Sequence, residues 1–187
     1  YKLIKAEIKK TDVILLSDFN YGCLPQQLVE KIIGLAINSN VKIVADSQSS
    51  SQIGDIARFK NTDLITPTEK EARISLRNNQ DGLEVLGNNL LNESYAKNML
   101  LKIGEEGVII YSRINESNVI TDQINALNSN PIDTAGAGDA MMVVTSLALA
   151  INENIWRSAY LGSLAAAIQV GRLGNIPLKN QELINYV

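Results

Sequence analysis

Short runs of apolar residues alternate with segments of helical periodicity along the first part of the chain. Uninterrupted apolar runs of this kind are typical of strands covered on both faces of a parallel sheet. We therefore expect strands at Val13–Leu16, Val41–Ala45, Asp63–Thr66, Asn98–Ile103 and Gly107–Tyr111. The last two flank Gly104-Glu105-Glu106-Gly107, whose spacing predicts a tight, hairpin-like connection.

Apolar residues at helical spacing separate these runs and dominate the chain after Gly138. The first helix is predicted by Leu28, Val29, Ile32, Ile33, Leu35 and Ala36. A second, Thr68–Leu76, follows Pro67, which suits the first turn of a helix. Three more are expected at Ala140–Ala150, Asn154–Val170 and Lys179–Val187. This order of strands and helices predicts an α/β fold with a mostly parallel sheet, and residues 1–187 show no internal domain boundary.

The composition is that of an ordinary globular protein, with 45% hydrophobic and 20% charged residues. The longest apolar segment, Ala140–Ile151, is shorter than the ~20 residues of a membrane helix and contains Thr145 and Ser146. The single cysteine, Cys23, and the lack of a recognisable signal peptide favour a cytoplasmic protein that binds no membrane. The net charge of −3, with scattered Lys and Arg, argues against nucleic-acid binding.

The chain contains no histidine, which restricts its chemistry. Ser–His and Cys–His nucleophile pairs and His-containing metal sites are excluded. Any catalysis must therefore use carboxylates, lysines, backbone amides or a bound metal ion.

The most informative motif is Asp133-Thr134-Ala135-Gly136-Ala137-Gly138-Asp139, directly before a predicted helix. Its small residues allow a ligand to approach the backbone, and the N–H groups at a helix start form an anion site. Asp139 falls in the first turn, where a base beside an anion site suits phosphoryl transfer. Helix capping or close packing is the alternative for such a glycine pair. A Walker loop and a dinucleotide fingerprint are excluded by the lack of Gly-Lys-Ser/Thr and of a third glycine.

This string resembles the Asp-Thr-x-Gly-Ala-Gly-Asp motif of ribokinase-like (PfkB-type) carbohydrate kinases, and is most similar to the kinase domain of bacterial heptose-7-phosphate kinases. Supporting segments occur in the same order as in that family: Ser17 to Gly22, Leu64 to Glu71, Lys102 to Gly107, and Val170 to Gly174. The resemblance implies a three-layer α/β/α fold. It also implies transfer of the ATP γ-phosphoryl group to a hydroxyl of a sugar or sugar phosphate, with Mg²⁺, and it allows a homodimer.

The resemblance also implies roles for individual residues. Asp139 would be the base that deprotonates the sugar hydroxyl, and the N–H groups of Gly136, Ala137 and Gly138 would form the anion hole. Glu71 would help to hold Mg²⁺ through water. Positions that would lie near the nucleotide or shape its turn are Lys102, Gly104, Gly107, Thr134, Ser163 and Ala166. Close helix packing is the alternative for the stretch that contains Ala166.

The sequence departs from the family pattern in three positions and in extent. Thr68, Tyr21 and Ser163 replace an Asn, a Lys and an Asn of the family motifs. The family's N-terminal part, with its sugar-binding Asp, Gly-Gly motif and lid strands, has no counterpart here. We therefore expect the chain to be the C-terminal, nucleotide-side part of a kinase domain, with low activity in isolation. A catalytically weak or inactive nucleotide-binding module of a larger sugar-nucleotide biosynthesis protein is the alternative.

Other polar and aromatic residues carry weaker signals. Asp46 and Asp18 end predicted strands, where ligands bind in open α/β sheets, but both also suit turns or caps. Cys23 has no partner for nucleophilic chemistry, and Trp156 and Tyr160 lie at helical spacing and are expected to pack.

Overall fold

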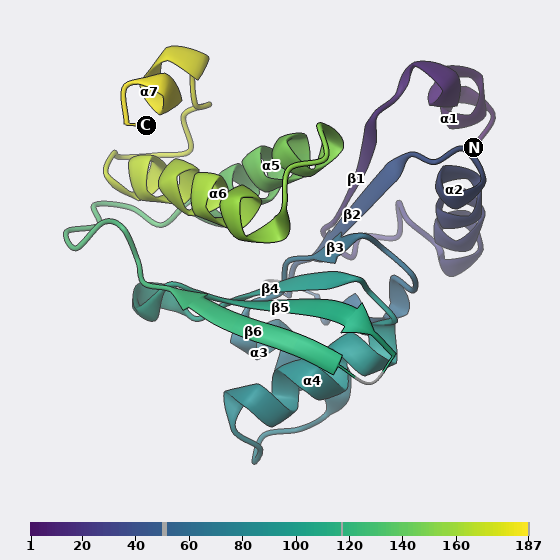
Figure 1. Cartoon of the computed structure of the whole chain (residues 1–187), viewed down its shortest axis with the longest axis horizontal. Helices are drawn as coiled ribbons and strands as arrows, with labels where there is room; N and C mark the ends of the chain where they lie inside the picture. The colour runs from purple at the N-terminus through teal and green to yellow at the C-terminus, as the bar shows by residue number, and fades with distance from the viewer. Residues whose placement is uncertain (50–51, 117, 187) are drawn as a thin grey trace.

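The computed structural model describes residues 1–49, 52–116 and 118–186, and is an open α/β sheet with helices on both faces (Figure 1). The polar segment from Ser47 to Gln52, whose composition is typical of a loop, includes residues 50 and 51, which lie outside the described residues. The strands are β1 (Val13–Asp18), β2 (Lys42–Ser47), β3 (Leu64–Ile65), β4 (Asn98–Lys102), β5 (Val108–Asn115) and β6 (Asn118–Ile124). The helices are α1 (Lys2–Glu7), α2 (Gln26–Asn38), α3 (Glu69–Leu76), α4 (Leu83–Ser94), α5 (Ala137–Ala150), α6 (Ile155–Val170) and α7 (Asn180–Ile184).

The strands lie in the sheet in the order in which they occur in the chain, from β1 to β6. The strands β1 to β4 pair in parallel, while β5 and β6 add as antiparallel strands. The turn between β4 and β5 confirms the predicted hairpin-like connection. The mostly parallel α/β sheet expected from the sequence is thus confirmed, although β3 is shorter than its apolar run.

Two hydrophobic clusters cover the two faces of the sheet. On one face, α2, α3 and α4 pack against strand residues that include Ile43, Ile65 and Leu101. On the other face, α5 and α6 pack against the alternate residues Val44, Leu64 and Leu100. Successive strand residues point to opposite faces, so the uninterrupted apolar runs in the sequence correspond to burial on both sides. The result is the expected three-layer α/β/α arrangement.

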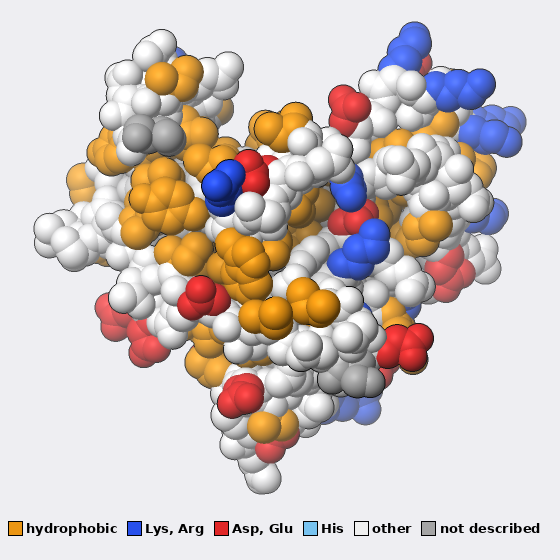
Figure 2. Space-filling model, in the orientation of Figure 1, with side chains coloured by type: hydrophobic (Ala, Val, Ile, Leu, Met, Phe, Trp, Pro, Cys, Tyr) orange, Lys and Arg blue, Asp and Glu red, His pale blue; other side chains and the backbone are white. Residues whose placement is uncertain are grey.

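The two helical layers leave different surfaces exposed. Hydrophobic side chains are exposed over the α5–α6 layer, among them Leu147, Ile151 and Tyr160, whereas basic side chains gather near α1 at the N-terminus (Figure 2). None of the helices in the described part of the chain combines the length and the apolar character needed to cross a bilayer.

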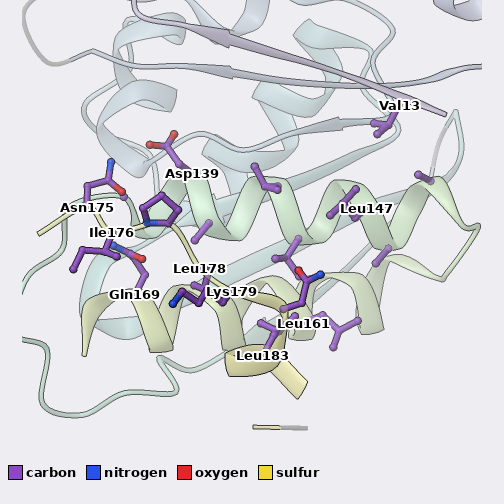
Figure 3. A pocket seen from close by; sticks show the side chains of 18 of the residues that line it. Val13, Asp139, Leu147, Leu161, Gln169, Asn175, Ile176, Leu178, Lys179 and Leu183 are labelled. Atoms are coloured by element: carbon purple, nitrogen blue, oxygen red, sulfur yellow. The ribbon is translucent and has the colours of Figure 1, made fainter. Parts of the chain in front are cut away.

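A groove of about 1110 Å³ runs along α5 between the edge strand β1 and the segment that leads to α7. Figure 3 shows Leu147 of α5 and Leu161 of α6 beside this groove, with Ile176 and Leu178 of the C-terminal segment across it. The groove leaves apolar side chains of α5 exposed on the side of the sheet edge.

Candidate active site

A pocket of about 250 Å³ lies where the carboxyl ends of β2 and β4 meet the N-termini of α3 and α5. Ligands bind at this edge of open α/β sheets because the ends of parallel strands and the positive ends of helices converge there. Its lining residues are Asp46, Gln48, Ser49, Thr68, Glu71, Lys102, Gly136, Gly138 and Asp139. Residues predicted from segments far apart in the sequence are thus brought together in one site.

The start of α5 presents backbone donors to this pocket. Gly136 is the N-cap at φ +78°, and the first intrahelical bond runs from the Ala140 N–H to the Gly136 carbonyl at 2.9 Å. Within the described structure, the N–H groups of Gly136, Gly138 and Asp139 have no hydrogen-bond partner, as is usual in the first turn of a helix. The Ala137 N–H differs, because it donates to the Thr134 carbonyl at 3.3 Å.

Gly136 is required by its conformation and by its surroundings. Its φ lies in the region that favours glycine, and a Cβ there would collide with the Asn175 side chain. The turn that opens α5 is therefore packed against the C-terminal segment.

Asp139 lies in the first turn of α5 and is half-buried. Figure 3 shows its carboxylate at the N-terminal end of the helix, pointing away from α6. Within the described structure the carboxylate has no hydrogen-bond partner, so its oxygens remain available to a ligand in the pocket. The arrangement suits a group that accepts a proton beside an anion site.

Asp46 and Lys102 form an ion pair at the base of the pocket. The Lys102 Nζ lies 3.3 Å from Asp46 Oδ1, and the same oxygen accepts a hydrogen bond of 3.0 Å from the Thr66 hydroxyl. Burial of Asp46 raises its pKa, Lys102 opposes this shift, and the nearby Glu71 carboxylate adds to it. A second cation or a hydrogen-bond donor in the pocket would therefore favour the charged form of Asp46.

Glu71 is held by the capping box of α3. Its two carboxylate oxygens accept hydrogen bonds from the N–H groups of Ser49 at 3.1 Å and Thr68 at 2.7 Å, while Thr68 Oγ1 caps the Glu71 N–H at 3.2 Å. Thr68, which replaces the asparagine of the family motif, thus still caps the helix. Each carboxylate oxygen has a further lone pair, so Glu71 retains acceptor capacity.

The pocket fits a hydrated Mg²⁺ ion rather than one enclosed by protein ligands. In the described part of the chain, no three acidic or cysteine side chains are grouped as a metal site. The Glu71 carboxylate nevertheless lines the pocket and keeps acceptor capacity. Magnesium usually keeps several waters and uses one or two carboxylates together with substrate phosphates, which matches this donor set.

Other predicted site residues lie outside this pocket. Gly104 and Gly107 form the turn after β4, both with positive φ. Thr134 is exposed before α5. Ser163 is buried in α6, where its hydroxyl has no partner within the described structure, and Ala166 packs against the cluster beneath α5 and α6. Ala166 thus has the packing contacts of the alternative interpretation, and its place near the nucleotide stays a prediction.

Two aspartates have structural roles outside the pocket. Asp18 is buried, pairs with Arg58 at 2.5 Å and accepts a hydrogen bond of 2.9 Å from the Asn20 N–H, which matches the turn role that its sequence position also allowed. Asp133, for which the sequence predicts no separate role, accepts hydrogen bonds from the N–H groups of Ala135 at 3.0 Å and Gly174 at 2.9 Å. Its place two residues before Ala135 is the typical spacing of an Asx turn, which is the signal that indicates this role.

The fold is that of ribokinase-like α/β proteins. The chain belongs to the pfkB family: a family model described as pfkB family carbohydrate kinase matches residues 2–181. Curated relatives include the bifunctional protein HldE of Sulfurimonas denitrificans, 26% identical over 184 residues, and that of Geotalea uraniireducens, 28% identical over 185 residues. These alignments cover 96% and 97% of this chain but only 36% of each relative.

Solved structures show the same fold. A ribokinase of Arabidopsis thaliana, complexed with ribose and ATP, superposes with a TM-score of 0.80 at 15% identity over 99% of this chain and 58% of its own. The phosphofructokinase-2 of Escherichia coli, in complex with potassium, gives 0.77 at 16% identity, over 98% of this chain and 60% of its own. The family model and the curated relatives confirm the expected family resemblance, and the solved structures confirm the expected fold.

Proposed function

We propose that this chain carries the nucleotide-binding and phosphoryl-transfer part of an ATP-dependent sugar kinase. The observation that supports it most directly is the sharing of one pocket by the Asp139 carboxylate, the unpaired N–H groups of Gly136 and Gly138, and Lys102. This pocket combines a base with fixed positive dipoles, which in-line phosphoryl transfer requires.

In the proposed reaction, the Asp139 carboxylate accepts the proton of a sugar hydroxyl as its oxygen forms a bond to the γ-phosphorus of ATP. The bond between that phosphorus and the β–γ bridging oxygen breaks, and ADP leaves with the bond's electron pair. The N–H groups at the start of α5 stabilise the negative charge on the phosphoryl oxygens. Bound Mg²⁺, held by Glu71 through water, would neutralise phosphate charge.

The acceptor is proposed to be a sugar or sugar phosphate, and heptose 7-phosphate is the first compound to test. This choice rests on the sequence resemblance to heptose-7-phosphate kinases and on the naming of the curated relatives as bifunctional proteins HldE. A cytoplasmic location, where ATP is plentiful, is part of the same proposal.

Residues 1–187 are proposed to form one domain that is the nucleotide-side part of a longer kinase domain. The groove along α5 and the open edge of β1 support this, because they leave apolar side chains such as Val143 and Leu147 exposed. The solved kinases, of which this chain covers 58% and 60%, contain further chain of their own. Intact-mass spectrometry of the natural gene product tests this proposal. A product that begins at Tyr1 and ends at Val187 would contradict it.

A second candidate function is nucleotide binding without catalysis within a larger protein. The replacements at Thr68 and Tyr21 favour it, since both fall in segments that resemble family motifs. Release of ADP by the full-length protein, measured over a panel of sugars and sugar phosphates with and without Mg²⁺, separates the two functions. Mg²⁺-dependent ADP release with one acceptor supports the kinase, whereas ATP binding without turnover on any acceptor supports the module.

A further inference from the structure

A lysine side chain lies directly against the first turn of α5. A Cβ added at Gly138 would come within 3.2 Å of the Lys102 Nζ and 3.8 Å of its Cδ. Gly138 does not have a positive φ, so backbone conformation does not require glycine here, and a Cβ would instead be in tight contact with the end of the Lys102 side chain. The absence of a side chain at position 138 thus leaves room for an ammonium group beside the helix N–H groups.

Lys102 is held in this place by its backbone and by its side chain. It ends β4, and its N–H donates to the Pro67 carbonyl at 2.8 Å. Its side chain is only 16% exposed and reaches Asp46, whose side chain is 4% exposed. The ammonium is therefore directed into the pocket instead of extending into solvent as most lysines do.

The charges in the pocket make this ammonium important for an anionic ligand. Among the described residues that line the pocket, Lys102 is the only cation, whereas Asp46, Glu71 and Asp139 are carboxylates. These negatively charged carboxylates repel a polyphosphate. The helix N-terminus contributes only about half a unit of positive charge. A full positive charge at the start of α5 offsets part of that repulsion.

Lys102 also has hydrogen-bonding capacity left. An ammonium carries three donors, and within the described structure its acceptor is Asp46 Oδ1 at 3.3 Å. That distance is longer than the ~2.7–2.9 Å of a strong charge-assisted hydrogen bond. Donors are thus available to a phosphoryl oxygen next to Gly138 without loss of the Asp46 contact.

We propose that Lys102 is a catalytic residue that contacts the transferring phosphoryl group, and that Asp46 is a positioning residue that holds its ammonium over the first turn of α5. This inference rests on the proposed kinase function. As the sugar oxygen binds the γ-phosphorus and the bond to ADP breaks, Lys102 stabilises the charge on the phosphoryl oxygens without gaining or losing a proton.

The test uses the full-length protein and the variant Lys102→Met, which removes the charge and keeps most of the aliphatic chain. The matched control is Lys97→Met, because Lys97 directly precedes β4 and pairs with Asp63 at 2.7 Å, outside the pocket. We expect kcat to fall by ~10²-fold in Lys102→Met, with little change in KM for the sugar or in MgADP affinity by calorimetry. Lys102→Arg should recover part of the activity, and Lys97→Met should remain close to wild type.

The role of Asp46 is tested by a double-mutant cycle with Lys102. A residue that acts only through Lys102 should have no effect on kcat once the Lys102 ammonium is removed. Asp46→Asn should lower kcat alone, yet lower it no further when added to Lys102→Met. Independent, additive losses would overturn the positioning role.

The remaining outcomes are distinguishable. If Lys102→Met does not fold, Lys102→Gln, which removes the charge but keeps a polar side chain, should lower kcat in its place. Wild-type turnover in well-folded Lys102→Met would overturn the Lys102 role and leave the kinase function standing. A wild-type protein that phosphorylates no acceptor would overturn both.

Discussion

The Asp133 carboxylate accepts a hydrogen bond from the Gly174 N–H at 2.9 Å, although the two residues are 41 positions apart in the sequence. Its other oxygen accepts from the Ala135 N–H at 3.0 Å. The same carboxylate thus fixes the turn before α5 and ties it to the C-terminal segment. The position of the N–H groups that we propose to bind phosphate depends on this link.

These two hydrogen bonds lower the pKa of Asp133 below its ordinary value. A lowered pKa in the folded state means that the stabilising contribution is complete above the unfolded-state pKa and is lost as pH falls through the folded-state pKa. We predict that Asp133→Asn lowers the melting temperature near neutral pH, and that the gap to wild type narrows as the pH is lowered toward about 3. Thermal unfolding followed by circular dichroism over this range measures the gap.

The control for this experiment is Asp12→Asn, since Asp12 is exposed and its carboxylate has no hydrogen bond within the described structure. This variant should follow the wild-type pH profile. A gap between Asp133→Asn and wild type that stays constant on acidification would contradict the role of the charged carboxylate.

Asp139 is predicted to act on the chemical step rather than on binding. Asp139→Asn keeps the shape of the side chain but removes the basic oxygen, so turnover in the full-length protein should fall by ~10²-fold or more. ATP affinity, measured by calorimetry, should be retained because the N–H groups of α5 are unchanged. Glu105→Gln, an exposed carboxylate on the turn after β4, serves as the control. Wild-type turnover in Asp139→Asn would contradict the proposed base.

Much of the fold could be predicted from local patterns. The strands with uninterrupted apolar runs, the helices α2, α3, α5 and α6, and the turn around Gly104 were all expected from their residues. Among the longer elements, α4 and β6 were not predicted. The helix α4 contains Gly87, which packs against the Tyr111 ring, and the pattern of β6 is mostly polar because it lies exposed at the edge of the sheet.

The site was predictable where it is contiguous in sequence and not where it depends on the order of strands. Asp139 and the glycines before it form one string, so the anion site at α5 could be anticipated. The pairing of Lys102 with Asp46 joins residues 56 positions apart on β4 and β2. This contact depends on the order of the strands in the sheet and on the space at Gly138. Neither can be predicted from a single sequence.

The capping box of α3 gives a prediction about the family motif residue that this chain lacks. Thr68→Ala removes the oxygen that caps the Glu71 N–H and should lower the free energy of unfolding by about 1 kcal/mol. Thr68→Asn should leave stability nearly unchanged, because asparagine is also a strong N-cap residue. Urea unfolding of the two variants beside wild type measures the difference. An equal loss of unfolding free energy in Thr68→Ala and Thr68→Asn would show that stability depends on the threonine methyl group rather than on capping.

The turn between β4 and β5 offers a matched pair of glycines. Gly107 has φ +99°, and a Cβ there would collide with the backbone of residues 124 to 126, whereas Gly104, at φ +67°, has open space around its Cβ position. Gly104→Ala should therefore cost about 1 to 2 kcal/mol of unfolding free energy, from backbone conformation alone. Gly107→Ala adds a steric clash with backbone that cannot rotate away, and should cost about 3 kcal/mol or more.

Displacement of this turn should also change the pocket, because Lys102 lies directly before the turn and pairs with Asp46. Gly107→Ala is therefore expected to weaken MgATP binding as well as stability, while Gly104→Ala mainly affects stability. Chemical unfolding and calorimetric titration of both variants test the two parts separately. Equal destabilisation by the two substitutions would mean that the β4–β5 turn relaxes around the added methyl group, and would remove the steric reason for glycine at position 107.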